Sequence, residues 1–243
     1  MEYYVNMNII LAFFDIDGTL IRRNRQDGLS LKSRSFNYAI EMIFDLKNVD
    51  YTSVLGRRIY GLTDKKVLKL TLSELGISEK QYQENEQKLF AAGNEYFDKH
   101  RLENGIPDYV PLPGVLEFLE LLRSRNVRLG LMTGNIKRHS NWKLIDAGFD
   151  GFFTTGAYGE DAENREEILS IAIERNADIP VSQICHFGDS PLDLEAARSC
   201  NVKGVVVSDK GGGTHSVQEL ETIGYGLVID TWRDLKAIEE YLS

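Results

Sequence analysis

A continuous apolar run followed at once by two aspartates is the feature that most constrains this chain. Residues 9–14 (Ile-Ile-Leu-Ala-Phe-Phe) are apolar throughout, and Asp15 and Asp17 follow directly. A run of this length and composition is typical of a strand buried on both faces of a parallel sheet. Open α/β sheets bind their ligands at the carboxyl ends of such strands. The sequence therefore predicts a parallel sheet whose functional edge carries these two acids.

The two acids favour a functional site over an ordinary acidic turn. The simpler interpretation is a turn, because Asp and Gly are common turn residues. Residues two apart in an extended chain project to the same side, however, so Asp15 and Asp17 would lie close together. Two like charges held there repel each other unless a cation or a shared proton lies between them. Gly18 and Thr19 follow, and Thr19 places a hydroxyl beside the acids.

Composition limits the classes of partner. The chain has 243 residues, which is enough for one large domain or a domain with a smaller insert. Its net charge of -9 disfavours nucleic acid or an anionic membrane as the main partner, although a locally positive pocket can still bind an anion. The two cysteines, Cys185 and Cys200, form no CxxC pair, and four scattered histidines disfavour a zinc site. With no membrane-length apolar run and no signal peptide pattern, we expect a cytoplasmic protein without a membrane partner.

A shift in pattern predicts two domains. Helical periodicity covers residues 30–46, 63–75 and 78 to about 105, where Ser78 and Gln81 form a capping-box pattern. Residues 22–25 are polar and basic, as in a linker. We therefore predict an all-helical domain over residues 22–106, inserted after the first strand, and a core domain formed by residues 1–21 and 107–243. An insert at this point lies over the end of the strand, where it can exclude water and select a substrate.

Strand and helix patterns alternate through the rest of the chain. Strands are predicted at 127–133, 151–154, 183–188, 202–208 and 226–230. Helices are predicted after residue 114 and at 139–147, 164–176, 191–200 and 233–242, with a capping box at Asn164 and Glu167. This alternation predicts an α/β fold with a doubly wound, Rossmann-like parallel sheet.

Further polar groups follow two of these strands. Thr133-Gly134-Asn135 offers a hydroxyl and backbone N–H groups that suit phosphate oxygens, although the same residues also suit a plain turn. Asp189 stands at the end of the 183–188 strand, while Asp193, in the first turn of a helix, also has a purely stabilising explanation. Mg²⁺ prefers hard oxygen ligands and keeps several waters. Asp15, the backbone carbonyl of Asp17 and Asp189 form a suitable ligand set.

Taken together, these segments resemble the motifs of the haloacid dehalogenase superfamily. Asp15-Ile-Asp17-Gly18-Thr19 is similar to its first motif, Thr133 stands at the second, and Gly188-Asp189-Ser190-Pro191-Leu192-Asp193 is similar to the fourth. The resemblance implies that Asp15 is a nucleophile that becomes an aspartyl phosphate, that Asp17 is the general acid and base, and that Thr133 holds the transferring phosphoryl group. It also implies a helical cap and a Mg²⁺ site at Asp15, Asp17, Asp189 and Asp193, with Asp193 in a supporting role. Substrate contacts are expected at Gly18, Thr19, Gly134 and Asn135.

The third motif of this superfamily is a single basic residue. The available residues are Lys137, Arg138, Lys143, Arg165 and Arg175. Arg165 is favoured because it opens the helix before the 183–188 strand, where the family carries its Lys or Arg. The alternative is a surface salt bridge between Arg165 and Glu163 or Glu166.

The predicted insert carries a segment that looks like the substrate loop of such caps. In Gly61-Leu62-Thr63-Asp64, an acid stands where sugar-phosphate mutases of the superfamily have a basic residue. This departure disfavours a mutase, although four basic residues lie nearby. These are Arg57, Arg58, Lys65 and Lys66, and charged residues on a helix surface are more often solvated than functional.

The sequence thus predicts a Mg²⁺-dependent phosphatase for a small phosphorylated metabolite. Within the superfamily, the pattern is most similar to that of phosphoglycolate phosphatases, but nothing in it selects one substrate. A dehalogenase is disfavoured, because those relatives lack an acid at the position of Asp17. A phosphotransferase or mutase on the same core, and a catalytically inactive binding protein, remain the alternatives. The sequence does not indicate an oligomeric state.

Overall fold

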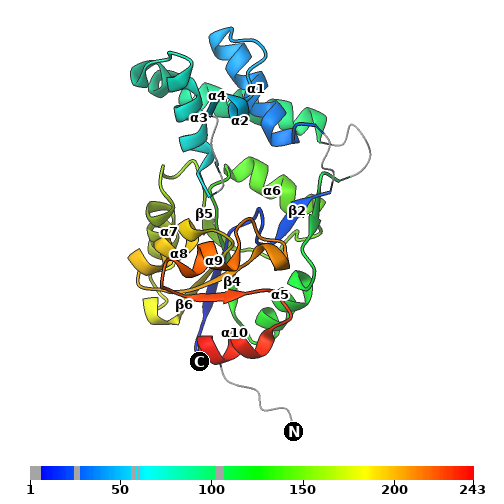
Figure 1. Ribbon diagram of the computed structural model, residues 1–243, viewed down its shortest axis with the longest axis vertical. Coiled ribbons are helices and arrows are strands. Elements are labelled where there is room, and N and C mark those ends of the chain that lie inside the picture. Colours follow the sequence, from blue (N-terminus) through cyan, green and yellow to red (C-terminus); the bar gives the residue numbers. More distant parts are fainter. Residues whose placement is uncertain (1–6, 25–27, 56–58, 60, 102–106) are drawn as a thin grey trace.

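Six parallel strands form the central sheet of the molecule (Figure 1). The computed structural model describes residues 7–24, 28–55, 59, 61–101 and 107–243. The first strand, β1 (Leu11–Phe14), pairs on one side with β4 (Arg128–Met132) and on the other with β6 (Ile184–Gly188). The full strand order is β5-β4-β1-β6-β7-β8, with β5 at Thr155–Ala157, β7 at Lys203–Val207 and β8 at Leu227–Ile229.

Helices cover both faces of this sheet. The side chains of Leu11 and Phe13 join a buried cluster with α7 (Arg165–Glu174) and α8 (Pro191–Ser199). The alternate residues Ala12 and Phe14 face the opposite side, where they pack with α5 (Val115–Ser124) and α10 (Leu235–Leu242). Successive side chains of a strand point to opposite faces, so a strand covered on both sides has to be apolar throughout. The predicted doubly wound α/β fold is confirmed.

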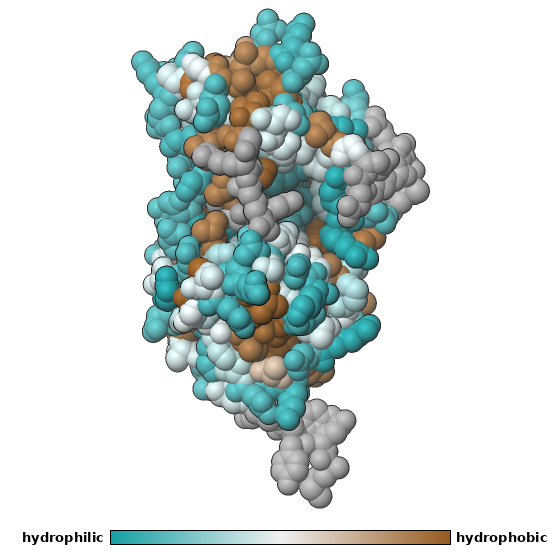
Figure 2. Space-filling model, viewed as in Figure 1, coloured by the Kyte–Doolittle hydropathy of each residue, from teal (hydrophilic) through white to brown (hydrophobic). Residues whose placement is uncertain are grey.

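The helices that the structure describes between β2 and residue 101 form a helical insert at the end of the molecule far from the C-terminus (Figure 1). They are α1 (Leu31–Phe44), α2 (Tyr51–Leu55), α3 (Asp64–Glu74) and α4 (Glu79–His100). The insert has a core of its own, built around Phe36, Leu68, Leu72 and Leu89. The predicted capping box of Ser78 and Gln81 is present at the start of α4. In Figure 2 apolar residues gather on the surface of this end of the molecule, at the top of the view.

The chain enters and leaves the insert through a paired ribbon. Strand β2 (Ile21–Arg23) lies antiparallel to β3 (Tyr109–Pro111), with Arg22 opposite Val110. The sequence interpretation of residues 22–25 as a simple linker missed this pairing, because three-residue strands leave no periodic signal. The ribbon ties the two connections together beside the carboxyl end of β1.

Local differences from the sequence prediction have physical causes. Strand β5 begins at Thr155, after the predicted 151–154 segment. Asn164 makes no capping bond at the start of α7, because its side chain instead accepts a hydrogen bond from Lys66 of the insert (3.0 Å). The helices α6 (Lys137–Asp146) and α9 (Val217–Glu221) complete the core. Among the described residues, no helix combines the length and apolar character needed to cross a membrane.

Candidate active site

The carboxyl ends of β1, β4 and β6 meet beneath the helical insert. A cavity of about 400 Å³ lies there, between the two parts of the molecule. The core contributes Asp15, Asp17, Gly18, Asn135, Lys143, Arg165 and Asp189 to its walls, and the insert contributes Ser30, Lys32, Tyr51, Gly61 and Leu62. The cavity is therefore shaped by both parts, and its polar groups come mainly from the core.

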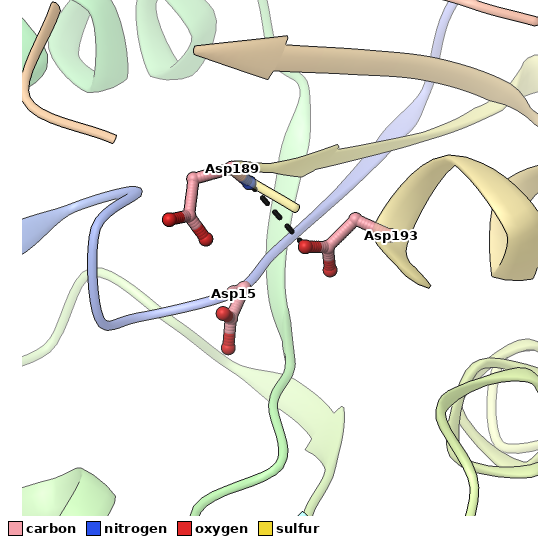
Figure 3. Close-up of side chains that lie close together, drawn as sticks. All are labelled: Asp15, Asp189 and Asp193. Atoms are coloured by element: carbon pink, nitrogen blue, oxygen red, sulfur yellow. Dashed lines mark hydrogen bonds between the residues drawn. The ribbon is translucent and has the colours of Figure 1, made fainter. Parts of the chain in front are cut away.

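Three aspartates gather at the bottom of this region (Figure 3). Each of Asp15, Asp189 and Asp193 offers a carboxylate oxygen within 4.8 Å of the others, and all three are buried. The backbone N–H of Asp15 donates to the carbonyl of Phe187 (2.9 Å), which holds the end of β1 against β6. The parallel register thus brings together Asp15 and Asp189, as the sequence predicted for acids that end neighbouring strands.

Gly18 permits the close approach of Asp189. Its φ is +77°, a region that favours glycine, and a Cβ atom at this position would lie 2.2 Å from Oδ2 of Asp189. The loop after β1 can therefore bend toward β6 only with glycine at this position. This close approach is a structural reason for the glycine of the Asp-x-Asp-Gly-Thr segment.

The three acids differ in the oxygens that they leave available. Oδ1 of Asp193 accepts from Arg165 (2.5 Å) and His186 (2.9 Å), and Oδ2 accepts from the hydroxyl of Ser190 (2.6 Å). Oδ1 of Asp15 is buried, yet it has no hydrogen-bond partner among the described residues. An unsatisfied buried carboxylate oxygen beside a second acid is a suitable ligand for a divalent cation. Asp15 and Asp189 fit a metal directly, whereas Asp193 is occupied in holding the loop.

Burial also changes the protonation of these acids. Burial raises the pKa of Asp15, despite the opposing charge of Arg165, and burial raises the pKa of Asp189 still further above its usual range. Asp193 is the reverse case: burial opposes its ionisation, but Arg165, His186 and the hydroxyl of Ser190 together outweigh burial and lower its pKa. A cation between Asp15 and Asp189 would favour the ionised form of both.

Arg165 connects this acid cluster to the insert. Its Nη2 lies 3.0 Å from Asp15, its Nη1 lies 2.5 Å from Asp193, and its Nε donates to the carbonyl of Gly61 (2.6 Å). The side chain is 7% exposed. Arg165 is therefore not the surface salt bridge that the alternative interpretation proposed, and the carboxylate of Glu163 pairs instead with Lys69.

The other basic residues considered for the third motif lie elsewhere or meet a different acid. Arg138 pairs with Asp98 and Arg175 pairs with Asp161, both at the surface, and Lys137 is exposed. Lys143, in contrast, is almost fully buried, and its Nζ lies 2.5 Å from Oδ2 of Asp17. The sequence marked Lys143 only as one basic residue among five. Its burial depends on the packing of β3 over α6, for which the sequence carries no local signal.

Asp17 stands beside this lysine at the cavity wall. Oδ2 of Asp17 also accepts from Nδ2 of Asn135 (2.9 Å). Burial opposes ionisation of Asp17, but the charges of Lys143 and Lys32 outweigh it and lower its pKa to about 2. The side chain nevertheless remains 42% exposed, so that it can meet a molecule in the cavity as a carboxylate.

Some of the remaining residues that were predicted to contact a substrate line the cavity, and the others lie beneath its wall. Gly18, Gly134 and Asn135 line the cavity. The side chains of Thr19 and Thr133 are fully buried beneath it, and the hydroxyl oxygen of Thr133 accepts from the amide of Asn135 (2.9 Å). The structure thus brings the second-motif segment beside Asp17, with Thr133 below the surface of the wall.

In the insert, Asp64 is a buried structural group. Its carboxylate forms an ion pair with Lys32 and accepts from the backbone N–H of Ile136 (3.0 Å). Lys65 pairs with Glu86 (3.3 Å) and Lys66 binds Asn164, so neither side chain reaches the cavity. Arg57 and Arg58 lie outside the described residues. Among the described residues, the insert places Lys32 in the cavity wall, and Arg22 and Arg23 of the β2–β3 ribbon also line it; sequence reasoning missed all three.

Comparison with known proteins identifies the relatives of this chain. The family model for haloacid dehalogenase-like hydrolases matches residues 10–201. A phosphorylated carbohydrates phosphatase of Thermotoga maritima is 25% identical over 211 residues, covering 86% of this chain and 87% of the relative. A phosphoglycolate phosphatase of Aquifex aeolicus is 26% identical over 201 residues, covering 81% and 83%. The crystal structure of CbbY from Rhodobacter sphaeroides in complex with phosphate is similar in fold, with a TM-score of 0.66 and 18% identity over 93% of this chain and 96% of CbbY.

Proposed function

This chain belongs to the haloacid dehalogenase-like hydrolase family, and we propose that it is a Mg²⁺-dependent phosphatase acting on a small phosphorylated metabolite through an aspartyl phosphate. One observation carries the proposal: Asp15, buried at the end of β1, has an unbonded carboxylate oxygen beside Asp189 and a guanidinium beside its other oxygen. A nucleophile facing a phosphate dianion needs positive charge on both sides.

The residues divide the reaction between them. Asp15 attacks phosphorus, so that a bond from its carboxylate forms while the bond to the leaving oxygen breaks. Asp17 is ionised in the free site, so it would take up a proton as the substrate binds, which the negative charge of the phosphate favours. It would then give that proton to the leaving oxygen and later take one from the water that hydrolyses the aspartyl phosphate. Arg165, which lines the cavity, would hold oxygens of the phosphoryl group. The hydroxyl of Thr133 lies below the wall and would act through the amide of Asn135, from which it accepts a hydrogen bond.

Three groups would hold the metal. These are the side chains of Asp15 and Asp189 and the backbone carbonyl of Asp17, while Asp193 orients Arg165 and the Ser190 turn. When bound, Mg²⁺ supplies charge that offsets the repulsion between the carboxylate of Asp15 and the phosphate.

The relatives guide the proposed substrate class. Their names refer to phosphorylated carbohydrates and to phosphoglycolate, which are both small phosphate monoesters. We propose the same class for this chain, with no nucleic acid or membrane partner and a cytoplasmic location. Asp64 disfavours a mutase. A second phosphate would need a basic residue at this position of the loop, and the acid that stands there is paired with Lys32.

The proposed division into domains follows the same reasoning. Residues 1–21 and 107–243 would form the catalytic core, and residues 22–106 a cap. Support comes from the apolar cluster that is formed mainly by the insert and from the β2–β3 ribbon where the two connections pass.

Hydrolysis of 4-nitrophenyl phosphate tests the proposal. We expect turnover that depends on Mg²⁺, disappears with EDTA and is lost in Asp15→Asn. Asp178→Asn is the matched control, because Asp178 is an exposed acid of the core whose side chain is 65% accessible. With a slowly hydrolysed substrate, acid quenching should trap one phosphate per chain on the peptide that contains Asp15. An absence of metal-dependent turnover in the parent protein would favour a binding protein instead. If the parent protein is active, a screen of phosphorylated metabolites for released phosphate would identify its substrate.

A further inference from the structure

Lys143 is a buried cation that the proposed reaction does not yet use. It lies in α6 with only 2% of its side chain exposed. Its ammonium contacts Oδ2 of Asp17 (2.5 Å) and Oδ1 of Asn135 (2.8 Å), and it lies 5.0 Å from the centre of the Tyr109 ring. Lysine is almost never fully buried unless it is paired. Its partner here is Asp17, the second acid of the Asp-x-Asp-Gly-Thr segment.

Lys143 also determines which way the amide of Asn135 points. Oδ1 of Asn135 accepts from Lys143 and from Lys32 (3.0 Å). An ammonium group can only donate, so the amide oxygen has to face the two lysines. The amide nitrogen is thereby directed toward the other side, where it donates to Asp17 and to the hydroxyl oxygen of Thr133, both at 2.9 Å.

Asp17 is consequently held through a single oxygen. The bonds from Lys143 and Asn135 both end on Oδ2, which restrains rotation of the carboxylate. Oδ1 is left for a group in the cavity, whose wall includes Asp17. Proton transfer requires the acid or base to lie within hydrogen-bond reach of the oxygen that it serves. A restrained carboxylate meets that requirement more often than a freely rotating one.

We propose that Lys143 is a positioning residue, which together with Asn135 holds Asp17 in the orientation needed for proton exchange with the leaving oxygen and the attacking water. The inference rests on the proposed phosphatase function. Lys143 only donates hydrogen bonds in this role: Asp17, which takes up a proton as the phosphate binds, transfers it to the leaving oxygen as the P–O bond breaks, and it takes one from water as the aspartyl phosphate is hydrolysed.

A double-mutant cycle between Lys143 and Asp17 tests this role. Lys143→Met removes the charge and keeps most of the side chain, and Lys137→Met is the control on the exposed face of the same helix. Positioned general acids and bases contribute about 10²–10⁴-fold, so we expect kcat to fall by about 10²-fold in Lys143→Met, with KM within about twofold of the parent. In an Asp17→Asn background the same substitution should cost nothing further, because residues that act as a unit are not additive.

A comparison of leaving groups provides a second readout. Glycerol phosphate has a poor leaving group, an alkoxide that needs a proton. The leaving group of 4-nitrophenyl phosphate is 4-nitrophenolate, which departs as a stable anion. Lys143→Met should therefore lose more activity on glycerol phosphate than on 4-nitrophenyl phosphate, as Asp17→Asn should. A purely structural effect would reduce both rates by the same factor and lower the melting temperature.

Three results would overturn the inference. These are additive losses in the cycle, equal losses on the two substrates, and an unchanged kcat in Lys143→Met. If Lys143→Met does not fold, the same cycle with Asn135→Ala decides, because Asn135 makes the second bond to Asp17 and has no charge to leave unpaired. Failure of the parent enzyme to hydrolyse either phosphate would instead refute the proposed function, so the two failures are distinguishable.

Discussion

Replacing Arg165 by Met should both destabilise the protein and abolish catalysis. The guanidinium is 7% exposed and lies between two buried carboxylates, those of Asp15 and Asp193. Removal of one partner from a buried ion pair leaves an uncompensated charge and costs about 3–5 kcal/mol. For a chain of this size, each kcal/mol lowers the melting temperature by about 2–4 °C. The expected shift for Arg165→Met is therefore about 6–20 °C.

Arg165→Lys separates charge from geometry. A lysine keeps a positive charge near Asp15 but presents its donors on one nitrogen, so it cannot also bind Asp193 and the carbonyl of Gly61. Each lost bond that involves a charged group costs about 1.5–3 kcal/mol. Because the lysine keeps its charge beside Asp15, it leaves less uncompensated charge than methionine does, and we expect Arg165→Lys to melt between the parent and Arg165→Met. Its activity should persist at a reduced level, since positive charge remains beside the nucleophile.

Thermal unfolding followed by circular dichroism, with EDTA present, measures these shifts. Arg128→Met is the control, because Arg128 is 42% exposed and its pair with Asp178 spans 3.4 Å. Such surface pairs contribute about 0–1 kcal/mol, so the control should melt within about 4 °C of the parent. If Arg165→Met melted no lower than Arg128→Met, the carboxylates would have to be protonated in the native state, and the charge argument for the site would fail.

Three further predictions concern the acids. Gly18→Ala should abolish Mg²⁺-dependent activity, because its Cβ would lie 2.2 Å from Asp189; Gly76→Ala, with a similar φ of +84° and no atom within 4 Å, should remain active in the same assay. Mg²⁺ at 100 times its Kd should stabilise the parent by about 2.7 kcal/mol in thermal unfolding, and Asp189→Asn should lose this effect. The pKa of Asp17 is lowered from 3.8 to about 2, so its ionised form adds stability above pH 4 that disappears as the pH falls toward 2. The melting temperatures of the parent and Asp17→Asn should therefore converge over that range, and a constant difference would contradict the pairing with Lys143.

The elements that could be predicted are those whose signal is local. Residues 9–14 show that β1 is buried on both faces, and neighbouring parallel strands necessarily end at the same edge. The meeting of Asp15 with Asp189 also requires β1 and β6 to be neighbours, and the order of the segments along the chain does not determine this. Helix starts with a good N-cap, such as Ser30 and Ser78, were also predictable, because the cap satisfies backbone N–H groups within the same few residues.

The groups that were missed depend on contacts between segments far apart in the chain. Lys32 looks like an ordinary surface lysine in the first turn of α1, and its place in the cavity becomes clear only when Asp64 of a later helix pairs with it. Asn164 has the sequence of an N-cap, but Lys66 of the insert competes for its side chain. Local propensity is outweighed wherever the insert and the core supply a partner, and most of these positions lie around the cavity.

The same contacts link closure of the insert to the state of the catalytic groups. The loop before α3 meets the core at three places: the carbonyl of Gly61 accepts from Arg165, Thr63 donates to the carbonyl of Glu163 (2.8 Å), and the N–H of Asp64 donates to the carbonyl of Gly134 (2.7 Å). Lys32, from the insert, also holds the amide oxygen of Asn135. A movement of the insert that separated these contacts would release one donor of Arg165 and one of the two lysines that orient Asn135. Asp17 would then lose part of its restraint while the cavity is open and regain it on closure. In the proposed mechanism, proton transfer at Asp17 would thereby be favoured in the closed arrangement, where the insert would also exclude bulk water from the aspartyl phosphate.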